Sequence, residues 1–210
     1  MVHGNAYYAG TREDLIALVP EGARRILEVG CGTGRTGARI KELRRSGVEV
    51  TGIEVDREAG EEAKSRLDRV LVGDVEEIDL PFEKEHFDCI ITGDVLEHLR
   101  DPWGLLKKHC AFLKTGGLVI ASIPNAAHYR VLKMLRKGEW NYSDAGLLDR
   151  GHLRFFTLKT IRAMFNEAGL SVETVRRVIR ASRLRRIVNA LSGGALIDRI
   201  TEQYLITARK

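Results

Sequence analysis

Residues 28–37 read EVGCGTGRTG, a glycine-rich stretch that overlaps the end of the short apolar run RRILEVG at residues 24–30. Such a run ending in glycine is typical of a buried parallel strand, and a helix is expected over residues 36–45. The glycines allow a sharp turn between the two elements and let a ligand approach the backbone at a helix N-terminus. The stretch therefore predicts a strand–turn–helix ligand site at the start of an α/β fold.

The glycines fit two spacings at once. Gly30, Gly32 and Gly34 give G-x-G-x-G, which is associated with S-adenosylmethionine, whereas Gly32, Gly34 and Gly37 give the G-x-G-x-x-G of nicotinamide and flavin sites. Both cofactors also use an acid at the end of the second strand for the ribose hydroxyls, and Glu54 stands there, about 20 residues beyond the loop. These residues alone do not discriminate between a sulfonium and a pyridine nucleotide.

Glu28 favours S-adenosylmethionine, which is a sulfonium, over a pyridine nucleotide. Its carboxylate lies inside an otherwise apolar strand, where burial costs several kcal/mol unless the group is paired or hydrogen-bonded. An anionic pyrophosphate gains nothing from this charge, whereas S-adenosylmethionine carries an ammonium group and a positive sulfur. The alternative is that Glu28 only pairs with a basic neighbour such as Arg24 or Arg25.

Strand and helix patterns alternate through most of the chain. Strands are expected at residues 48–56, 69–74, 87–94 and 118–122, and helices at 57–67 and from Asp101 to the pair Gly116-Gly117. A later helix, capped by Thr157 and ended by Gly169, precedes two alternating strands, at residues 170–178 and 202–209, with a basic helix between them. Alternation of this kind implies right-handed crossovers and an open parallel sheet with helices on both faces.

Residues 123–156 interrupt this alternation. They contain five of the thirteen aromatic residues, more than twice an even share, with weak periodicity. We expect one domain over residues 1–210, with 123–156 as a small substrate cap inserted between the fifth strand and the following helix. Trp140, Tyr142 and Phe155 either form an apolar wall for a substrate or simply pack within this cap.

The net charge is +5, and residues 175–186 contain six arginines and no acid. They are expected to form a solvated helix face, or alternatively a patch for phosphorylated, glycan or nucleic-acid partners. No apolar stretch is long enough for a membrane span, and the N-terminus lacks the pattern of a secretory signal. Cys31, Cys89 and Cys110 are widely spaced in apolar segments, so we expect reduced thiols in a cytoplasmic protein.

With Glu28 in place, ILEVGCGTG (26–34) resembles the first motif of the class I S-adenosylmethionine-dependent methyltransferases. The resemblance continues over nearly the whole chain beyond Tyr7, through VTGIEVD, LVGDVEE, FDCIITGDVLEHLRDP, LKTGGLVIASIPN, HLRFFTLKTIRAMFNEAGL and QYLITARK. It implies a Rossmann-like three-layer sandwich whose seven strands follow the order 3-2-1-4-5-7-6, with the seventh antiparallel.

The resemblance also implies a site for S-adenosylmethionine, formed by Tyr8, Glu28, Gly30, Gly32, Gly34, Glu54, Asp74, Val75 and Gly93. In it, Glu54 binds the ribose diol, Asp74 meets the adenine amino group, and the backbone amide of Val75 reaches the ring. Tyr7 or Tyr8 binds the methionine carboxylate, unless both tyrosines only pack on the sheet edge.

Methyl transfer to an alcohol requires a base, because the hydroxyl must lose its proton. His98 and His152 are the candidates, although either is also an ordinary packing residue. No N-P-P-Y or Pro-Cys motif is present, which argues against methylation of nucleic-acid bases. We expect no metal ion, because Asp74 and Asp94 alone do not provide the clustered carboxylates and asparagine of a catechol-type site.

The sequence therefore favours O-methylation of a hydroxyl on a small molecule or a sugar or glycan precursor. A partial resemblance to the methionine biosynthesis protein W family leaves open a cofactor-binding partner protein without its own transfer chemistry. A nicotinamide-dependent oxidoreductase is the third hypothesis. Neither the substrate nor the oligomeric state is indicated by the sequence.

Overall fold

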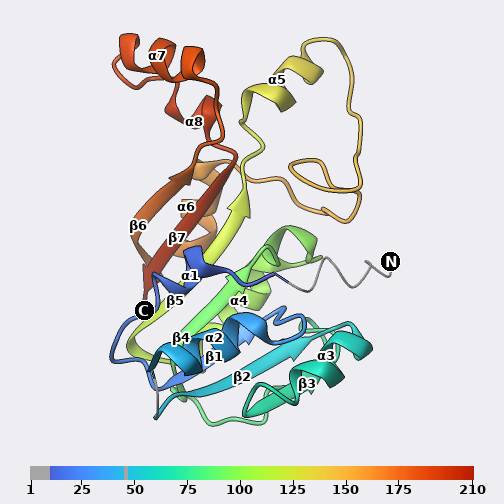
Figure 1. Ribbon diagram of the computed structural model, residues 1–210, viewed down its shortest axis with the longest axis vertical. Helices are drawn as coiled ribbons and strands as arrows, with labels where there is room; N and C mark the ends of the chain where they lie inside the picture. The colour runs from blue at the N-terminus through green and yellow to red at the C-terminus, as the bar shows by residue number, and fades with distance from the viewer. Residues whose placement is uncertain (1–9, 45–46) are drawn as a thin grey trace.

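The computed structural model describes residues 10–44 and 47–210. Within these residues seven strands form one sheet in the order β3-β2-β1-β4-β5-β7-β6 (Figure 1). The strands are β1 Arg25–Val29, β2 Glu49–Glu54, β3 Arg69–Val72, β4 Phe87–Gly93, β5 Leu113–Pro124, β6 Ser171–Val178 and β7 Gln203–Arg209. Strands β1 to β5 are parallel, whereas β7 runs antiparallel to both β5 and β6. The strand order implied by the resemblance is confirmed.

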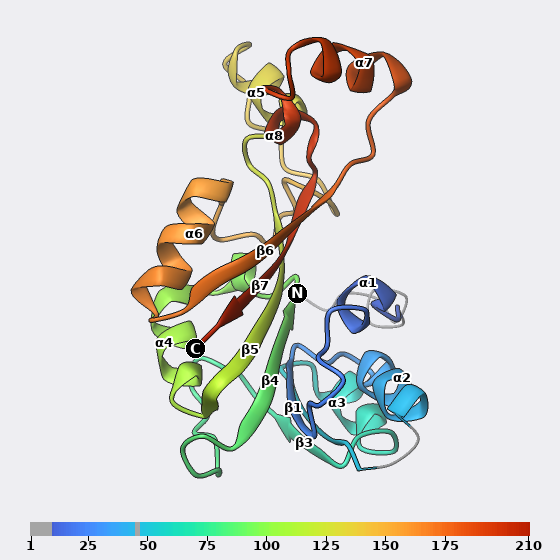
Figure 2. The same ribbon diagram turned by 90° about the vertical axis from the view of Figure 1, so that its left-hand side faces the viewer.

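Helices cover both faces of the sheet and complete three layers (Figure 2). One face carries α1 Glu13–Ile16, α2 Arg35–Arg44 and α3 Arg57–Ala63, and the other carries α4 Pro102–Cys110 and α6 Leu158–Glu167. Side chains alternate along a strand, so Leu27 and Val29 pack with the core under α4 and α6, whereas Ile26 packs with the core under α1 and α2. Glu28 shares the face of Ile26 by the same alternation.

The two helices of the second face begin as the sequence predicts. Asp101 accepts a hydrogen bond from the Gly104 amide at 3.0 Å, with Pro102 at the first position of α4. Thr157 and Thr160 form a reciprocal capping box at the start of α6.

The predicted end of α4 is wrong. The helix ends at Cys110, and Leu113 is already the first residue of β5, paired with Phe87. Gly116, at φ +78°, lies instead where the register between β4 and β5 shifts. A pair of glycines occurs in irregular strands as well as at helix ends. The pair Gly116-Gly117 therefore does not distinguish between these two structures.

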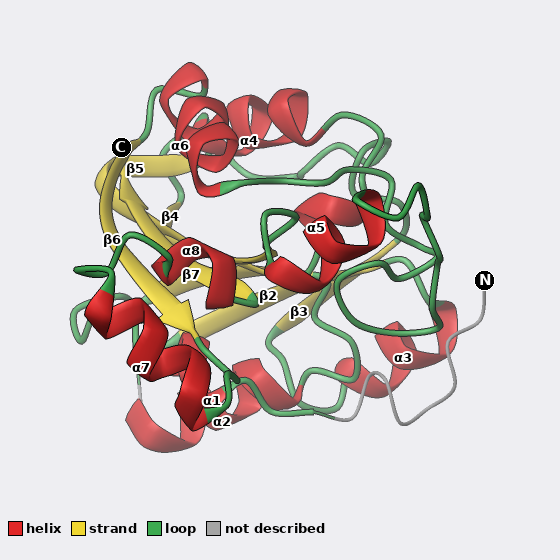
Figure 3. Cartoon of the chain, turned by 90° about the horizontal axis from the view of Figure 1, so that it is seen from above, coloured by secondary structure: helices red, strands yellow, loops and turns green. Residues whose placement is uncertain are grey.

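The segment from residue 123 to 156 contains α5 Tyr129–Leu135 and a long loop, and it lies over the carboxyl end of β5 (Figures 1 and 3). Next to it stand α7 Arg183–Leu191 and α8 Ile197–Ile200. The expected basic helix is thus present, but residues 175–178 belong to β6. Helix α7 is also not a purely charged face, because it exposes Leu184, Ile187, Val188 and Leu191.

All three cysteines are buried and free. In the part of the chain that the structure describes, none of the helices combines the length and the apolar character needed to cross a membrane.

Candidate active site

The loop between β1 and α2 depends on three glycines. Gly30, Gly32 and Gly34 adopt φ values of +67°, +54° and +77°, a region that other residues rarely occupy. A Cβ on Gly30 would also lie 2.6 Å from a methyl group of Val95. The predicted sharp turn is therefore present, and side chains at these positions would distort it.

Gly37 has a different role, because it lies within α2. A Cβ there would lie 2.5 Å from Leu67 and 2.8 Å from Val50, so only glycine lets the helix pack this closely on the sheet. The match to the dinucleotide spacing thus arises from helix–sheet packing, as it also does in true dinucleotide folds.

Glu54 joins the end of β2 to the glycine loop. Its carboxylate accepts hydrogen bonds from the Gly32 amide at 2.7 Å and from the Asp56 amide at 2.9 Å. Burial raises the pKa of Glu54, and these two bonds oppose that rise. The acid expected at this position is in place, and its oxygens retain lone pairs for a ribose hydroxyl.

Glu28 is buried beneath the start of α2, with 6% of its surface exposed. Desolvation raises the pKa of Glu28 to about 8, and the negative charge of Glu54 adds to this rise. The Gly37 amide and the Thr36 hydroxyl act in the opposite direction and lower the pKa. Within residues 10–44 and 47–210, Oε2 of Glu28 has no hydrogen-bond partner. An unpaired carboxylate oxygen beside the loop is suited to a cationic ligand.

The alternative role of Glu28 does not occur. Among the described residues, no basic group shifts its pKa. Within the described residues, Glu28 is therefore not neutralised by its basic neighbours in the sequence.

The residues expected at the adenine end follow β3. Asp74 accepts a hydrogen bond from the Glu76 amide at 2.9 Å and lies 3.2 Å from the guanidinium group of Arg100. Val75 is buried. Gly93 ends β4, where a Cβ would lie 2.7 Å from the Leu15 side chain, so this glycine lets α1 approach. Tyr7 and Tyr8 lie outside the described residues.

The two histidines predicted as candidate bases, His98 and His152, lie side by side. His98 belongs to the short helix η1 Leu96–His98, and His152 belongs to the loop before α6. Their ring centroids are 4.8 Å apart at an interplanar angle of 75°. The amides of Leu153 and Arg154 donate to the Glu97 carbonyl at 2.8 and 2.9 Å, and these bonds fasten the loop to η1.

The residue before η1 packs against the glycine loop. Val95 immediately precedes η1, and its side chain contacts Gly30. The chain segment that carries His98 therefore begins against the turn where a cofactor would bind. The short helix η1 and the glycine loop therefore lie at the same carboxyl edge of the sheet, where open α/β sheets bind their ligands.

Sequence reasoning missed a polar network around Asp94. Its carboxylate bonds with the guanidinium of Arg12, the amide of Gln203 and the hydroxyl of Ser122, the last at 2.7 Å. Ser122 and Gln203 come from neighbouring strands. Because β7 runs antiparallel to β5, its first residue, Gln203, lies at the carboxyl end of β5. The antiparallel seventh strand implied by the family resemblance was the signal that could have indicated this contact.

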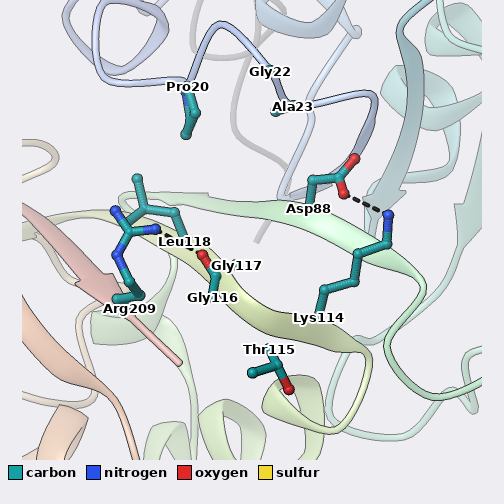
Figure 4. Close-up of a pocket in the computed structure, with 10 residues that line it drawn as sticks. All are labelled: Pro20, Gly22, Ala23, Asp88, Lys114, Thr115, Gly116, Gly117, Leu118 and Arg209. Carbon is teal, nitrogen blue, oxygen red and sulfur yellow. Dashed lines mark hydrogen bonds and ion pairs between the residues drawn. The ribbon is translucent and has the colours of Figure 1, made fainter.

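A pocket at the opposite edge is unrelated to these groups. Figure 4 shows it between the turn at Pro20 and the beginning of β5, where Asp88 and Lys114 form an ion pair at 2.6 Å. It adjoins the amino ends of β4 and β5, away from the glycine loop. We therefore do not assign it to the cofactor.

A family model described as a methyltransferase domain matches residues 3–175. The chain belongs to this family. Together with the strand order and the glycine loop, the match places the chain in the class I family of S-adenosylmethionine-dependent methyltransferases. S-adenosylmethionine is accordingly the cofactor, and the hypothesis of a nicotinamide oxidoreductase is wrong.

Three curated relatives illustrate the family. A ubiquinone biosynthesis O-methyltransferase from Bradyrhizobium diazoefficiens is 32% identical over 57% of this chain and 52% of its own length. A 27-O-demethylrifamycin SV methyltransferase from Amycolatopsis mediterranei is 25% identical over 76% of this chain and 58% of its own length. An uncharacterized protein from Methanocaldococcus jannaschii is 27% identical over 76% and 77%. The chain thus spans little more than half the length of the first two methyltransferases.

Solved structures share the fold. A methyltransferase from Archaeoglobus fulgidus aligns with a TM-score of 0.70 at 17% identity and covers 98% of this chain and 97% of its own. A possible histamine N-methyltransferase from Thermotoga maritima aligns with a TM-score of 0.67 at 20% identity over 98% and 92%. At these identities the likeness concerns the fold alone.

Proposed function

We propose that the protein transfers a methyl group from S-adenosylmethionine to a hydroxyl oxygen of a small molecule or of a sugar or glycan precursor. The observation that carries this proposal is the convergence of His98 and His152, because the segment with His98 begins after Val95, which packs against Gly30. The printed names of relatives from B. diazoefficiens and Penicillium expansum, both O-methyltransferases, support the same chemistry.

The proposed cofactor site uses the residues described above. Glu54 binds the ribose hydroxyls, Asp74 and the Val75 amide bind adenine, and Glu28 stabilises the positive charges of the methionine part. The remaining members are Tyr8, Gly30, Gly32, Gly34 and Gly93. The Oε2 of Glu28, which has no hydrogen-bond partner among the described residues, fits this cationic ligand.

S-adenosylmethionine supplies an already activated methyl carbon when it is bound, so the protein has to position the acceptor oxygen and accept its proton. Both imidazoles use Nδ1 to contact a backbone carbonyl, which leaves Nε2 free to accept a proton. Burial, aided by the neighbouring His98, lowers the pKa of His152, so this ring is neutral at pH 7 and able to act as a base.

The segment 123–156 is the proposed substrate cap. Trp140 and Phe155 stack edge to face with ring centroids 5.0 Å apart, and Phe155 also lies 6.3 Å from the His152 ring. This apolar surface beside the base suits a substrate that carries both a hydroxyl and a hydrophobic part. We also propose a cytoplasmic location, in keeping with three unpaired buried thiols.

Transfer of a radiolabelled methyl group to fractions of cell extract tests the proposed function. We expect label in a small molecule or glycan precursor, with mass spectrometry locating the methyl group on oxygen. The absence of labelled product, combined with binding of S-adenosylhomocysteine, would instead support the partner-protein hypothesis derived from the methionine biosynthesis protein W resemblance.

Glu54→Gln is expected to weaken binding of S-adenosylhomocysteine by about 1–3 kcal/mol, because the ribose diol loses a charged acceptor. Isothermal titration calorimetry measures this change. Glu61→Gln is the matched control, since Glu61 is exposed on α3 and forms an ion pair with Lys64. Equal affinities for the wild type and Glu54→Gln would remove Glu54 from the cofactor site.

A further inference from the structure

Glu97, His98 and His152 form a cluster with metal-binding potential. Each offers one ligand atom, and the three atoms lie within 4.8 Å of one another. Ligand atoms around a tetrahedral zinc ion are about 3.3 Å apart, given metal–ligand distances near 2.0 Å. Small side-chain rotations would therefore bring the three atoms onto a common ion.

The two histidines are oriented as metal ligands usually are. Nδ1 of His98 lies 3.0 Å from the Gly151 carbonyl oxygen, and Nδ1 of His152 lies 3.3 Å from the Leu147 carbonyl oxygen. A carbonyl oxygen only accepts, so each Nδ1 carries the proton and each Nε2 keeps a free lone pair. Metal-bound histidines typically donate their other ring nitrogen to such an acceptor, which fixes the tautomer and the ring orientation.

Glu97 supplies an independent observation. The residue is 1% exposed, and neither carboxylate oxygen has a hydrogen-bond partner among the residues that the structure describes. Burial raises the pKa of Glu97, and the negative charges of Asp94 and Asp149 add to this rise, whereas Arg12 opposes it. The Arg12 guanidinium bonds with Asp94 and Asp14 instead. A buried carboxylate of this kind is ordinarily paired or bound to a metal.

We propose that Glu97, His98 and His152 bind a divalent first-row transition-metal cation, with open coordination positions for the acceptor substrate. Two imidazole nitrogens and one carboxylate are a donor set that suits Zn²⁺, Co²⁺, Mn²⁺ or Fe²⁺ better than Mg²⁺ or Ca²⁺. The expectation of no metal considered only Asp74 and Asp94. Asp94 is engaged by Arg12, Ser122 and Gln203, whereas the adjacent Glu97 is free.

The role of this cation rests on the proposed function. A bound cation lowers the pKa of a coordinated hydroxyl, whose proton then passes to water. Both Nε2 atoms are occupied by the metal in this form, so the histidines hold the cation and do not accept the proton directly. The same cluster that would act as a base without metal thus activates the hydroxyl through the cation.

Binding of Co²⁺ to the full chain, freed of metal with EDTA, tests the site without any methyl transfer. We expect one Co²⁺ per chain by calorimetry, with visible d–d absorption of a low-symmetry site. Glu97→Gln and His152→Ala should each weaken Co²⁺ binding at least tenfold, whereas His86→Ala, which changes a histidine packed on Phe82 and Phe87, should not.

Circular dichroism verifies that the variants are folded. Co²⁺ binding that is absent from the folded wild type, or equal in the wild type and folded Glu97→Gln, would overturn the site. If Co²⁺ binds at the cluster but methyl transfer is the same with and without metal, the activating role is wrong while the proposed function stands. If no methyl transfer occurs either with or without a cation, the proposed function and the activating role both fail, and Co²⁺ binding alone decides whether the metal site exists.

Discussion

A variant with both His98→Ala and His152→Ala is expected to lose methyl transfer by about 10²–10⁴-fold, the usual contribution of a positioned proton acceptor. The two rings meet at the carboxyl edge of the sheet, and removing both leaves no imidazole in the cluster either to accept the hydroxyl proton or to hold a cation. Binding of S-adenosylhomocysteine should change little, because the glycine loop is built from other residues. The assay is radiolabelled transfer to the extract fraction that the wild type methylates.

His86→Ala is the control for loss of a histidine far from this edge, and thermal unfolding verifies that the double variant retains the native fold. Transfer by the folded double variant within a few-fold of the wild type would remove both histidines from the mechanism. Such a result would move the search for the acceptor site to the Asp94 network.

Glu28→Gln is expected to abolish a large pH dependence of stability. The folded protein holds the Glu28 pKa at about 8, above its ordinary value of 4.5, so the native state binds a proton that the unfolded chain releases. This contribution is present at pH values below 4.5 and is lost as the pH rises through 8. Linkage gives a loss of about 3 kcal/mol between pH 5.5 and 8.5 in the ligand-free wild type.

Glutamine does not titrate. Between pH 5.5 and 8.5, the decrease in the free energy of unfolding should therefore be smaller in Glu28→Gln than in the wild type, by about 3 kcal/mol. Urea unfolding of both proteins at the two pH values measures the difference. Its affinity for S-adenosylmethionine should fall at the same time, because the variant cannot supply a negative charge. Identical pH profiles for the two proteins would show that Glu28 is already ionised at pH 5.5 in the folded state.

The geometry of the proposed cofactor site was largely predictable. The glycine turn and the positions of Glu28 and Glu54 are local features of the sequence, although the glycines and Glu54 suit two cofactors and only Glu28 favours one of them. Strand order was not derivable from periodicity, because alternating patterns predict a parallel sheet without its sequence of neighbours. It came from the resemblance to the methyltransferases.

The proposed acceptor site was predictable only in part. His98 and His152 were each identified, but their proximity depends on the path of a cap with weak periodicity. Glu97 lies beside His98 in the sequence, yet nothing there indicates that both of its carboxylate oxygens lack partners, because burial of that carboxylate is a property of the assembled fold. Arg12 and Gln203 reach Asp94 from opposite ends of the chain.

The raised pKa of Glu28 illustrates the same limit. An acid in an apolar strand indicates a function, but the size of the shift depends on how completely α2 covers it. That coverage relies on Gly37, where any side chain would hold the helix away from the sheet. Packing between distant elements therefore sets the electrostatics that the local sequence only suggests.

A crystal structure with S-adenosylhomocysteine tests the central claim most directly. The account predicts the ribose at Glu54, the homocysteine amino group on the side of Glu28, and the sulfur facing the cluster of Glu97, His98 and His152. A nucleoside bound elsewhere, with that cluster turned away from the sulfur, would contradict it.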